Sequence, residues 1–161
     1  MNVNPATWNA ISERIKAYYT AANTAGYLNS VGFGDPNTIV SVDDNGKQRV
    51  DLHYPLLWGE LEYPLPVYDE GKFTRWYINI WTLDAIESDE SNLQYALSDM
   101  ATIFQDCIAW LRNDGTTQGY SIESIETPTQ IKDSTTDKLG GWKTRIVIRT
   151  AQHPGMCYVN Q

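Results

Sequence analysis

The sequence contains no run of about 20 apolar residues, the length that a helix needs to cross a bilayer. Residues 1–8 also lack the basic stretch followed by an apolar one that marks a secretory signal. We therefore expect a protein that is made in the cytosol and does not associate with membranes. Cysteine is equally scarce, because Cys107 and Cys157 are the only two and lie too far apart to indicate a disulfide framework or a zinc site. We expect Cys107 to be a buried small apolar side chain.

Few residues are placed for catalysis. His53 and His153 are the only histidines, and neither has a partner at the spacing of a metal site or a catalytic triad, so we expect His53 to be exposed. The segment Gly32-Phe33-Gly34 leads towards Pro36 and not into a helix, which excludes a phosphate-binding loop. The segment Asp43-Asp44-Asn45-Gly46 lacks the acidic residue that ends a calcium loop and indicates a turn.

The remaining candidates for catalysis are carboxylates. Glu60 and Glu62 could serve as a general acid and a general base, but two carboxylates on one side of an extended segment more often form a solvated face. No serine, threonine or cysteine has the local sequence of a nucleophile. We therefore predict that the protein is not an enzyme and that it binds no metal and no cofactor.

Positive charge is scarce in the middle of the chain. The net charge is −8, and residues 61–126 carry three basic and twelve acidic side chains, whereas residues 127–161 carry five basic and two acidic ones. This distribution argues against a protein that grips a nucleic-acid backbone, which needs clustered Lys and Arg. It would allow identical copies to pair, the basic end of one against the acidic middle of the next. A solubilising acidic surface is the alternative interpretation.

The longest periodic pattern runs from about Ser88 to Gly115 and predicts one amphipathic helix, capped by Ser88 or Ser91 and ended by Gly115. A shorter amphipathic helix is predicted from Asn4-Pro5 to about Gly26. The apolar residues of the long helix recur at steps of three and four and form one stripe, which consists of Leu93, Ala96, Leu97, Met100, Ile103, Phe104, Cys107, Ile108 and Leu111.

Alternating residues predict strands around these helices. Residues 38–42 and 49–58 flank the turn at 43–46 and would form a hairpin, after a loop at 27–37. Residues 59–74 are predicted to be an extended arm or hairpin, because Pro64 and Pro66 exclude a central strand.

The strongest strand pattern lies at residues 75–83, which are largely apolar on both faces and are therefore expected to be central in a sheet or to expose one face to a partner. Strands at 120–127 and 142–150 follow, separated by a flexible or contact loop at 128–141. In the last strand, Trp142 begins the row that faces inward and Lys143 the row that faces outward. The order predicts a single domain, residues 1–161, of the α+β class: an antiparallel or mixed sheet covered on one face by the long helix and the N-terminal helix.

Aromatic residues are abundant, with six tryptophans and ten tyrosines. We expect most of them in the core, and subunit interfaces are the second interpretation, since both residue types are enriched there. A third interpretation is a sugar-binding platform formed by Trp58, Trp76, Trp81 or Trp142.

Two parts of the sequence resemble a known group of proteins. The segments Tyr77-Ile-Asn-Ile-Trp-Thr-Leu-Asp84 and Asn92-Leu-Gln-Tyr-Ala-Leu-Ser-Asp99 resemble neck proteins of tailed bacteriophages. So does the closing pattern of Thr127-Pro128, Asp137-Lys-Leu-Gly-Gly-Trp142 and Cys157-Tyr-Val-Asn160. The likeness covers residues 75–161 and is greatest to the tail-terminator or tail-completion proteins of phages of the Bacteroidetes type. The arm at 59–74 and the residues after Val159 match no part of that pattern.

The resemblance implies a small α+β subunit that forms a ring, usually of six copies, in the neck of the virion after assembly in the host cytoplasm. The partners would be further copies of the chain, the tail-tube protein and the head connector, and DNA would pass through the bore without sequence-specific binding. An adaptor or stopper nearer the portal is the alternative within this class. Other classes are a carbohydrate- or host-surface-binding module and a small hydrolase.

A ring subunit needs two different complementary surfaces. For contacts between subunits we expect the aromatic and basic residues Trp81, Trp142, Lys143, Arg145 and Arg149. For an acidic bore or interface we expect Glu60, Glu62, Asp69, Glu70, Glu87, Asp89 and Glu90.

Overall fold

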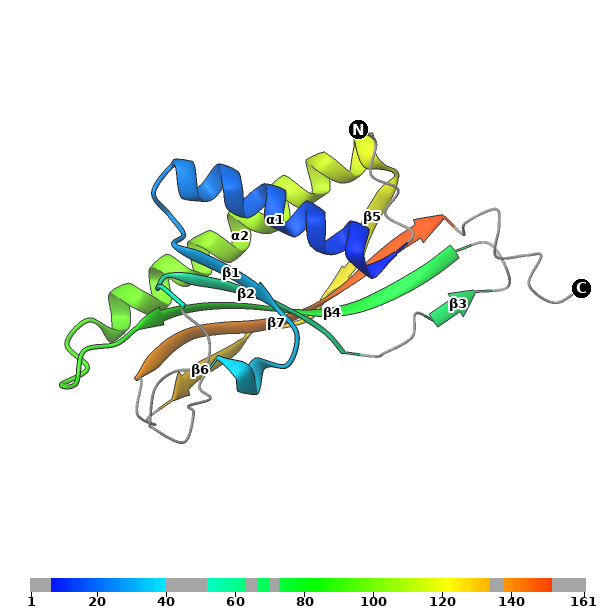
Figure 1. Cartoon of the computed structure of the whole chain (residues 1–161). Helices are drawn as coiled ribbons and strands as arrows, with labels where there is room; N and C mark the ends of the chain where they lie inside the picture. Colours follow the sequence, from blue (N-terminus) through cyan, green and yellow to red (C-terminus); the bar gives the residue numbers. More distant parts are fainter. Residues whose placement is uncertain (1–6, 40–51, 63–66, 70–72, 134–137, 152–161) are drawn as a thin grey trace, which may run out of the picture.

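The structure is a computed structural model that describes residues 7–39, 52–62, 67–69, 73–133 and 138–151 (Figure 1). Two α-helices, α1 (Trp8–Thr24) and α2 (Leu93–Gln118), cover one face of a seven-stranded sheet, which confirms the predicted α+β fold. The strands are β1 (Ser30–Phe33), β2 (Leu56–Leu61), β3 (Val67–Asp69), β4 (Phe73–Ala85), β5 (Tyr120–Ile125), β6 (Thr129–Asp133) and β7 (Leu139–Ala151). A short 3-10 helix, η1 (Pro36–Thr38), follows β1.

The sheet is built on β4 and β7, which are 13 residues long and antiparallel from Phe73↔Ala151 to Ala85↔Leu139. Its order is β1-β2-β4-β7-β5, and β3 pairs with β4 while β6 pairs with β7. All pairs are antiparallel except β1 with β2, so the sheet is mixed. The prediction that residues 75–83 form a central strand is confirmed, since β4 has a partner on both edges.

The helices and the sheet enclose one main core. Trp76, Ile78 and Ile80 of β4 pack there with Ile146 and Ile148 of β7, because alternate residues of a strand point to the same face. The apolar stripe of α2 covers them, and Cys107 is fully buried in it, as predicted. From α1 the core receives Ile11, Ile15 and Tyr18. A smaller apolar cluster lies on the other face of the sheet and consists of Ile39, Leu56, Trp58, Leu83 and Leu139.

Both helices begin later than predicted. Thr7 is the N-cap of α1, where its hydroxyl accepts a hydrogen bond from the amide of Ala10 at 3.2 Å. The predicted start at residues 4–5 lies outside the described residues. The predicted cap of α2 by Ser88 or Ser91 is wrong, because the helix starts only after Asn92. The Asn92 side chain instead holds the preceding loop: its oxygen accepts from the Glu87 amide and its nitrogen donates to the Ala85 carbonyl.

The predicted end of α2 at Gly115 is also wrong. The helix continues through Gly115 to Gln118 and ends at Gly119, whose φ of 81° suits a residue without a side chain. Gly115 is needed for a different reason, since a Cβ atom there would lie 2.5 Å from the carbonyl oxygen of Tyr120. It allows β5 to start close against the helix.

The strands differ from the prediction in four places. Thr38 belongs to η1 and not to a strand, and the predicted turn at 43–46 lies outside the described residues. Residues 40–51 of the predicted hairpin likewise lie outside the described residues. Residues 56–58 belong to β2, which pairs in parallel with β1, and β1 lies in the segment 27–37 that was predicted to be a loop. Residues 59–61 belong to β2 and not to an arm, whereas Pro64 and Pro66 lie outside the described residues. The predicted loop at 128–141 contains β6.

Candidate interaction surface on the helix-free face of the sheet

The face of the sheet opposite the helices carries most of the residues that the sequence analysis selected. Along β7, Trp142 and Ile146 point towards the helices, whereas Lys143, Arg145 and Arg149 point away, so the predicted alternation is confirmed. Their partners in register on β4 and β2 share this orientation. We call this surface the helix-free face; it comprises Glu60, Glu62, Phe73, Arg75, Asn79, Trp81, Lys143, Arg145 and Arg149.

Arg145 lies at the centre of the helix-free face. Its guanidinium donates a hydrogen bond to Glu126 at 2.9 Å and another to Glu62, and both carboxylates raise its pKa above the ordinary arginine value. Its neighbour in register on β4 is Asn79, which donates to Glu60 at 3.0 Å. The contacts therefore run across three strands and into the residue that follows β5.

The other cations of this face also have partners within the subunit. Lys143 lies over the ring of Trp81, with its ammonium nitrogen 4.8 Å from the ring centroid. The guanidinium carbon of Arg149 is 4.4 Å from the centroid of Phe73. Arg75, which is opposite Arg149 in the sheet, pairs with Glu123 at 2.8 Å. Each of these cations therefore has a contact inside one chain, with a carboxylate or with an aromatic ring.

The structure brings together four of the five residues expected at subunit contacts. Trp81, Lys143, Arg145 and Arg149 lie on the helix-free face. Trp142 is separate from them, because it is half-buried on the helix side, where its indole nitrogen donates to the carbonyl of Leu97 at 2.8 Å.

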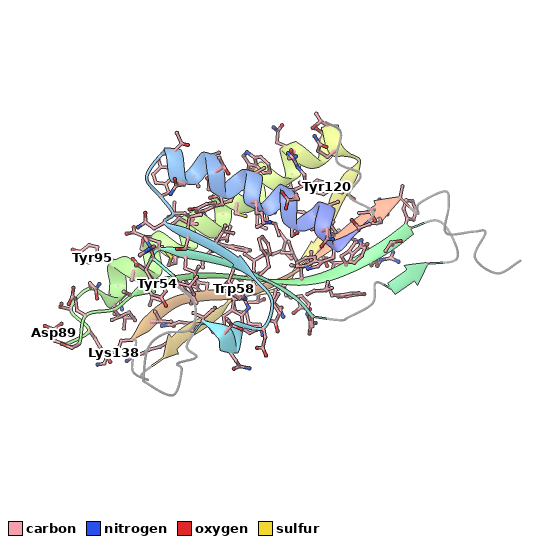
Figure 2. The ribbon with its side chains drawn as sticks, in the orientation of Figure 1. Tyr54, Trp58, Asp89, Tyr95, Tyr120 and Lys138 are labelled. Carbon is pink, nitrogen blue, oxygen red and sulfur yellow. The ribbon has the colours of Figure 1, made fainter. Side chains whose placement is uncertain are left out.

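The expected acidic surface is divided between two places. Glu60 and Glu62 belong to the helix-free face, whereas Glu87, Asp89 and Glu90 lie in the loop between β4 and α2, at one end of the molecule (Figure 2). In this loop Glu90 pairs with Lys132 of β6 at 2.8 Å, and Lys138 donates to the Ser88 carbonyl. The side chain of Asp69 and the whole of Glu70 lie outside the described residues.

The tryptophans do not form a platform for a sugar ring. Trp58 is 4% exposed and Trp76 is 5% exposed, so both belong to the core, as expected for most aromatic residues. Trp142 packs against α2, and the lysine described above covers Trp81. His53 is exposed, as predicted.

We expect Arg145→Gln to lower the free energy of unfolding by about 1 kcal/mol, because Glu62 and Glu126 lose their shared cation on a surface that solvent partly screens. Urea denaturation would measure the change. Lys16→Gln is the matched control: Lys16 pairs with Glu13 on an exposed part of α1, and its loss should cost less than about 0.5 kcal/mol. Equal losses in the two variants would contradict the central position given to Arg145.

A groove of about 450 Å³ lies on the helix side of the molecule and was not predicted. It opens between α2 and the turn after α1, and its lining consists of Gly26, Tyr27, Pro55, Asp99, Met100, Thr102, Ile103 and Asp106. The sequence held one signal, since Asp99, Thr102 and Asp106 recur at steps of three and four on the polar side of the long helix. The turn after α1 and Pro55 are distant in sequence from α2, so the sequence pattern does not indicate that they lie opposite this helix.

The pKa of Asp84, at the end of β4, depends on the negative charge of Asp99 in this groove. Partial burial raises the pKa of its carboxyl, a hydrogen bond from the Ala85 amide lowers it, and the negative charge of Asp99 raises it. The net shift is upward, so the fold favours the protonated form. Stability is therefore lost as pH rises from the unfolded pKa of 3.8 through the folded one.

Asp84→Asn removes this cost and keeps the acceptor for the Ala85 amide. We expect the variant to be more stable than the wild type at pH 7 by about 0.5 kcal/mol, given solvent screening at a half-buried site, and equally stable below pH 3.8. Thermal unfolding at several pH values would measure both. Glu87→Gln, an exposed change in the following loop, should shift neither curve. A gain for Asp84→Asn that persists at low pH would show another cause.

Among the residues that the structure describes, no three His, Cys, Asp or Glu side chains come together as a metal site would require. Neither described helix is long and apolar enough to cross a membrane. Comparison of the sequence with models of protein families and with curated proteins gives no match.

Proposed function

We propose that the chain is a structural subunit of a bacteriophage neck, which forms a ring that ends the tail tube and joins it to the head connector. The observation that supports this best is the internal pairing of the helix-free face. Its polar and aromatic side chains bind one another across neighbouring strands, as in the contact of Glu60 with Asn79 and Trp81. The side chains of such a face are held by one another, as suits a structural surface, whereas an enzyme directs these residue types into a cleft.

The charge of the chain fits a ring through which DNA passes. A net charge of −8 disfavours adhesion to phosphate groups, so a genome would slide past without being bound. The partners under this proposal are further copies of the chain, six in the usual ring, together with the tail-tube protein and the head connector. The ring would assemble in the host cytoplasm and remain in the neck of the virion. A stopper or adaptor nearer the portal is the alternative position.

Native mass spectrometry and negative-stain electron microscopy of the purified chain would test the proposal. We expect a closed oligomer with a central opening at micromolar concentration, and antibody against the chain should label virions at the junction of head and tail. A stable monomer at these concentrations would overturn the ring. A monomer that also binds glycans would favour the host-surface-binding module instead.

A further inference from the structure

The groove beside α2 is lined by one of the two strongly exposed aromatic residues of the described chain. Two large apolar side chains are strongly exposed among the described residues: Tyr27, which is 59% exposed and lines the groove, and Tyr95, which is 76% exposed. Tyr95 is not a lining residue, but it precedes the lining residue Asp99 by one helical turn and points away from the ribbon (Figure 2). Exposed tyrosines around a hollow are typical of protein interfaces and not of an isolated surface.

The described lining of the groove is also acidic and contains no lysine or arginine. Asp99 and Asp106 line it one above the other on α2, and Asp84 lies near Asp99. One oxygen of Asp106 accepts a hydrogen bond from the hydroxyl of Tyr18 at 3.0 Å. Within the described part of the chain, no lysine or arginine pairs with these carboxylates. The floor is apolar, since Met100 and Ile103 are buried. A long side chain with an apolar stem and a positive end fits such a hollow.

Among the described residues, one exposed cation has no partner in the subunit and could fill this groove in another copy. Most cations of the described residues already contact a carboxylate, a carbonyl oxygen or an aromatic ring: Arg14, Lys16, Arg75, Lys132, Lys138, Lys143, Arg145 and Arg149. Arg112 is the described cation for which the structure gives no such partner, and it is exposed on α2. It lies six residues after Asp106, which places the two side chains about a third of a turn apart around the helix.

We propose that the groove receives Arg112 of a second copy of the chain, so that α2 carries both halves of the contact between neighbouring subunits. The guanidinium would pair with Asp99 and lie against Tyr27, and planar cations favour such acidic and aromatic surroundings. Because the two halves point in different directions, the contact is head-to-tail, which is the kind that builds rings. This inference rests on the ring proposed above and names the surface that closes it.

Charge reversal tests the contact. Asp99→Arg and Arg112→Asp each set like charges against each other in every contact of a homo-oligomer, and each should raise the concentration for half-assembly by about tenfold or more. An equimolar mixture of the two variants restores opposite charges at every contact of an alternating ring with an even number of subunits. The double variant Asp99→Arg/Arg112→Asp restores them as well. We expect both to assemble within about threefold of the wild-type concentration.

Mass photometry over a dilution series would give these concentrations, and circular dichroism would show that each variant is folded. Glu13→Arg and Lys16→Asp, at two exposed positions of α1, are the controls. They change the net charge by the same amounts as Asp99→Arg and Arg112→Asp and should leave assembly unchanged. Asp99→Asn is a milder variant with an intermediate loss expected, in case the arginine perturbs folding. If the wild type forms a ring whose assembly is unaffected by substitution of Asp99 and Arg112, this contact is wrong but the ring proposal stands. The same holds if each charge reversal impairs assembly and the mixture of the two variants does not restore it. A monomeric wild type would overturn both.

Discussion

Gly141→Ala is expected to lower the free energy of unfolding by about 3 kcal/mol or more, because the new methyl group has no space between two paired strands. Gly141 of β7 lies opposite Leu83 of β4, and a Cβ atom there would be 1.8 Å from the carbonyl oxygen of Thr82. Backbone held by hydrogen bonds on both sides cannot move away, so the long β4–β7 pair would have to separate locally. Chemical denaturation monitored by tryptophan fluorescence would measure the loss.

Gly59→Ala is the matched control for this change. Gly59 also lies in the sheet, but its added Cβ atom would meet the ring of Phe33, at 2.8 Å, and not backbone. That ring is only half-buried and can rotate, so we expect a loss below about 1.5 kcal/mol. If the two variants lost equal stability, the cost would come from the loss of glycine itself and not from contact with the neighbouring strand.

Asp114→Ala should cost about 3 kcal/mol, because this carboxylate joins α1, α2 and β5. Its oxygens accept hydrogen bonds from Arg14 at 2.5 and 2.7 Å and from the hydroxyl of Tyr120 at 2.8 Å. The side chains of Arg14 and Asp114 are 17% and 9% exposed, so removal of one leaves the other charge largely without water. The bonded carboxylate also holds the pKa of Arg14 above its ordinary value. Urea denaturation would measure the loss.

Two further variants separate the charge from the hydrogen bonds. Asp114→Asn keeps an acceptor for Tyr120 and should lose about half as much as Asp114→Ala. In the double variant Arg14→Met/Asp114→Ala neither charge remains buried, so the loss should be smaller than the sum of the single losses by about 1–3 kcal/mol. Strict additivity would mean that the two side chains stabilise the fold independently.

The sequence predicted the elements whose residues repeat regularly over a long stretch. The stripe of α2 and the alternation along β4 and β7 are of this kind, since ten or more residues report the same period. β1 was missed because four residues that include a glycine carry almost no period, and because its partner β2 lies more than twenty residues away. The role of Gly115 is not visible in the sequence, because the close approach of Tyr120 that requires a glycine there is a tertiary contact.

The candidate surfaces were predicted in part for the same reason. Strand alternation placed Lys143, Arg145 and Arg149 on one face, but the pattern could not show that Glu62 and Glu126 lie within reach of Arg145. Division of the chain into an acidic middle and a basic end therefore suggested charges free for a neighbouring copy. Folding brings these segments together, so that Arg145 of the basic end pairs with Glu62 and Glu126 inside the subunit. Among the described residues, Asp99, Asp106 and Arg112 of α2 are charges without an ion pair in the subunit.

The order of β4 and β7 along the chain leaves one edge of β4 without its partner during synthesis. α2, β5 and β6 all lie between these strands in the chain, so β4 is synthesised long before the strand that completes its hydrogen bonds. Until then a 13-residue strand that is rich in apolar residues has one open edge, which is the feature that favours aggregation of nascent chains. Early docking of α2 on β4 covers one face of the strand but not that edge. Yield in the cell should therefore depend on chaperones that hold the chain until its last strand emerges.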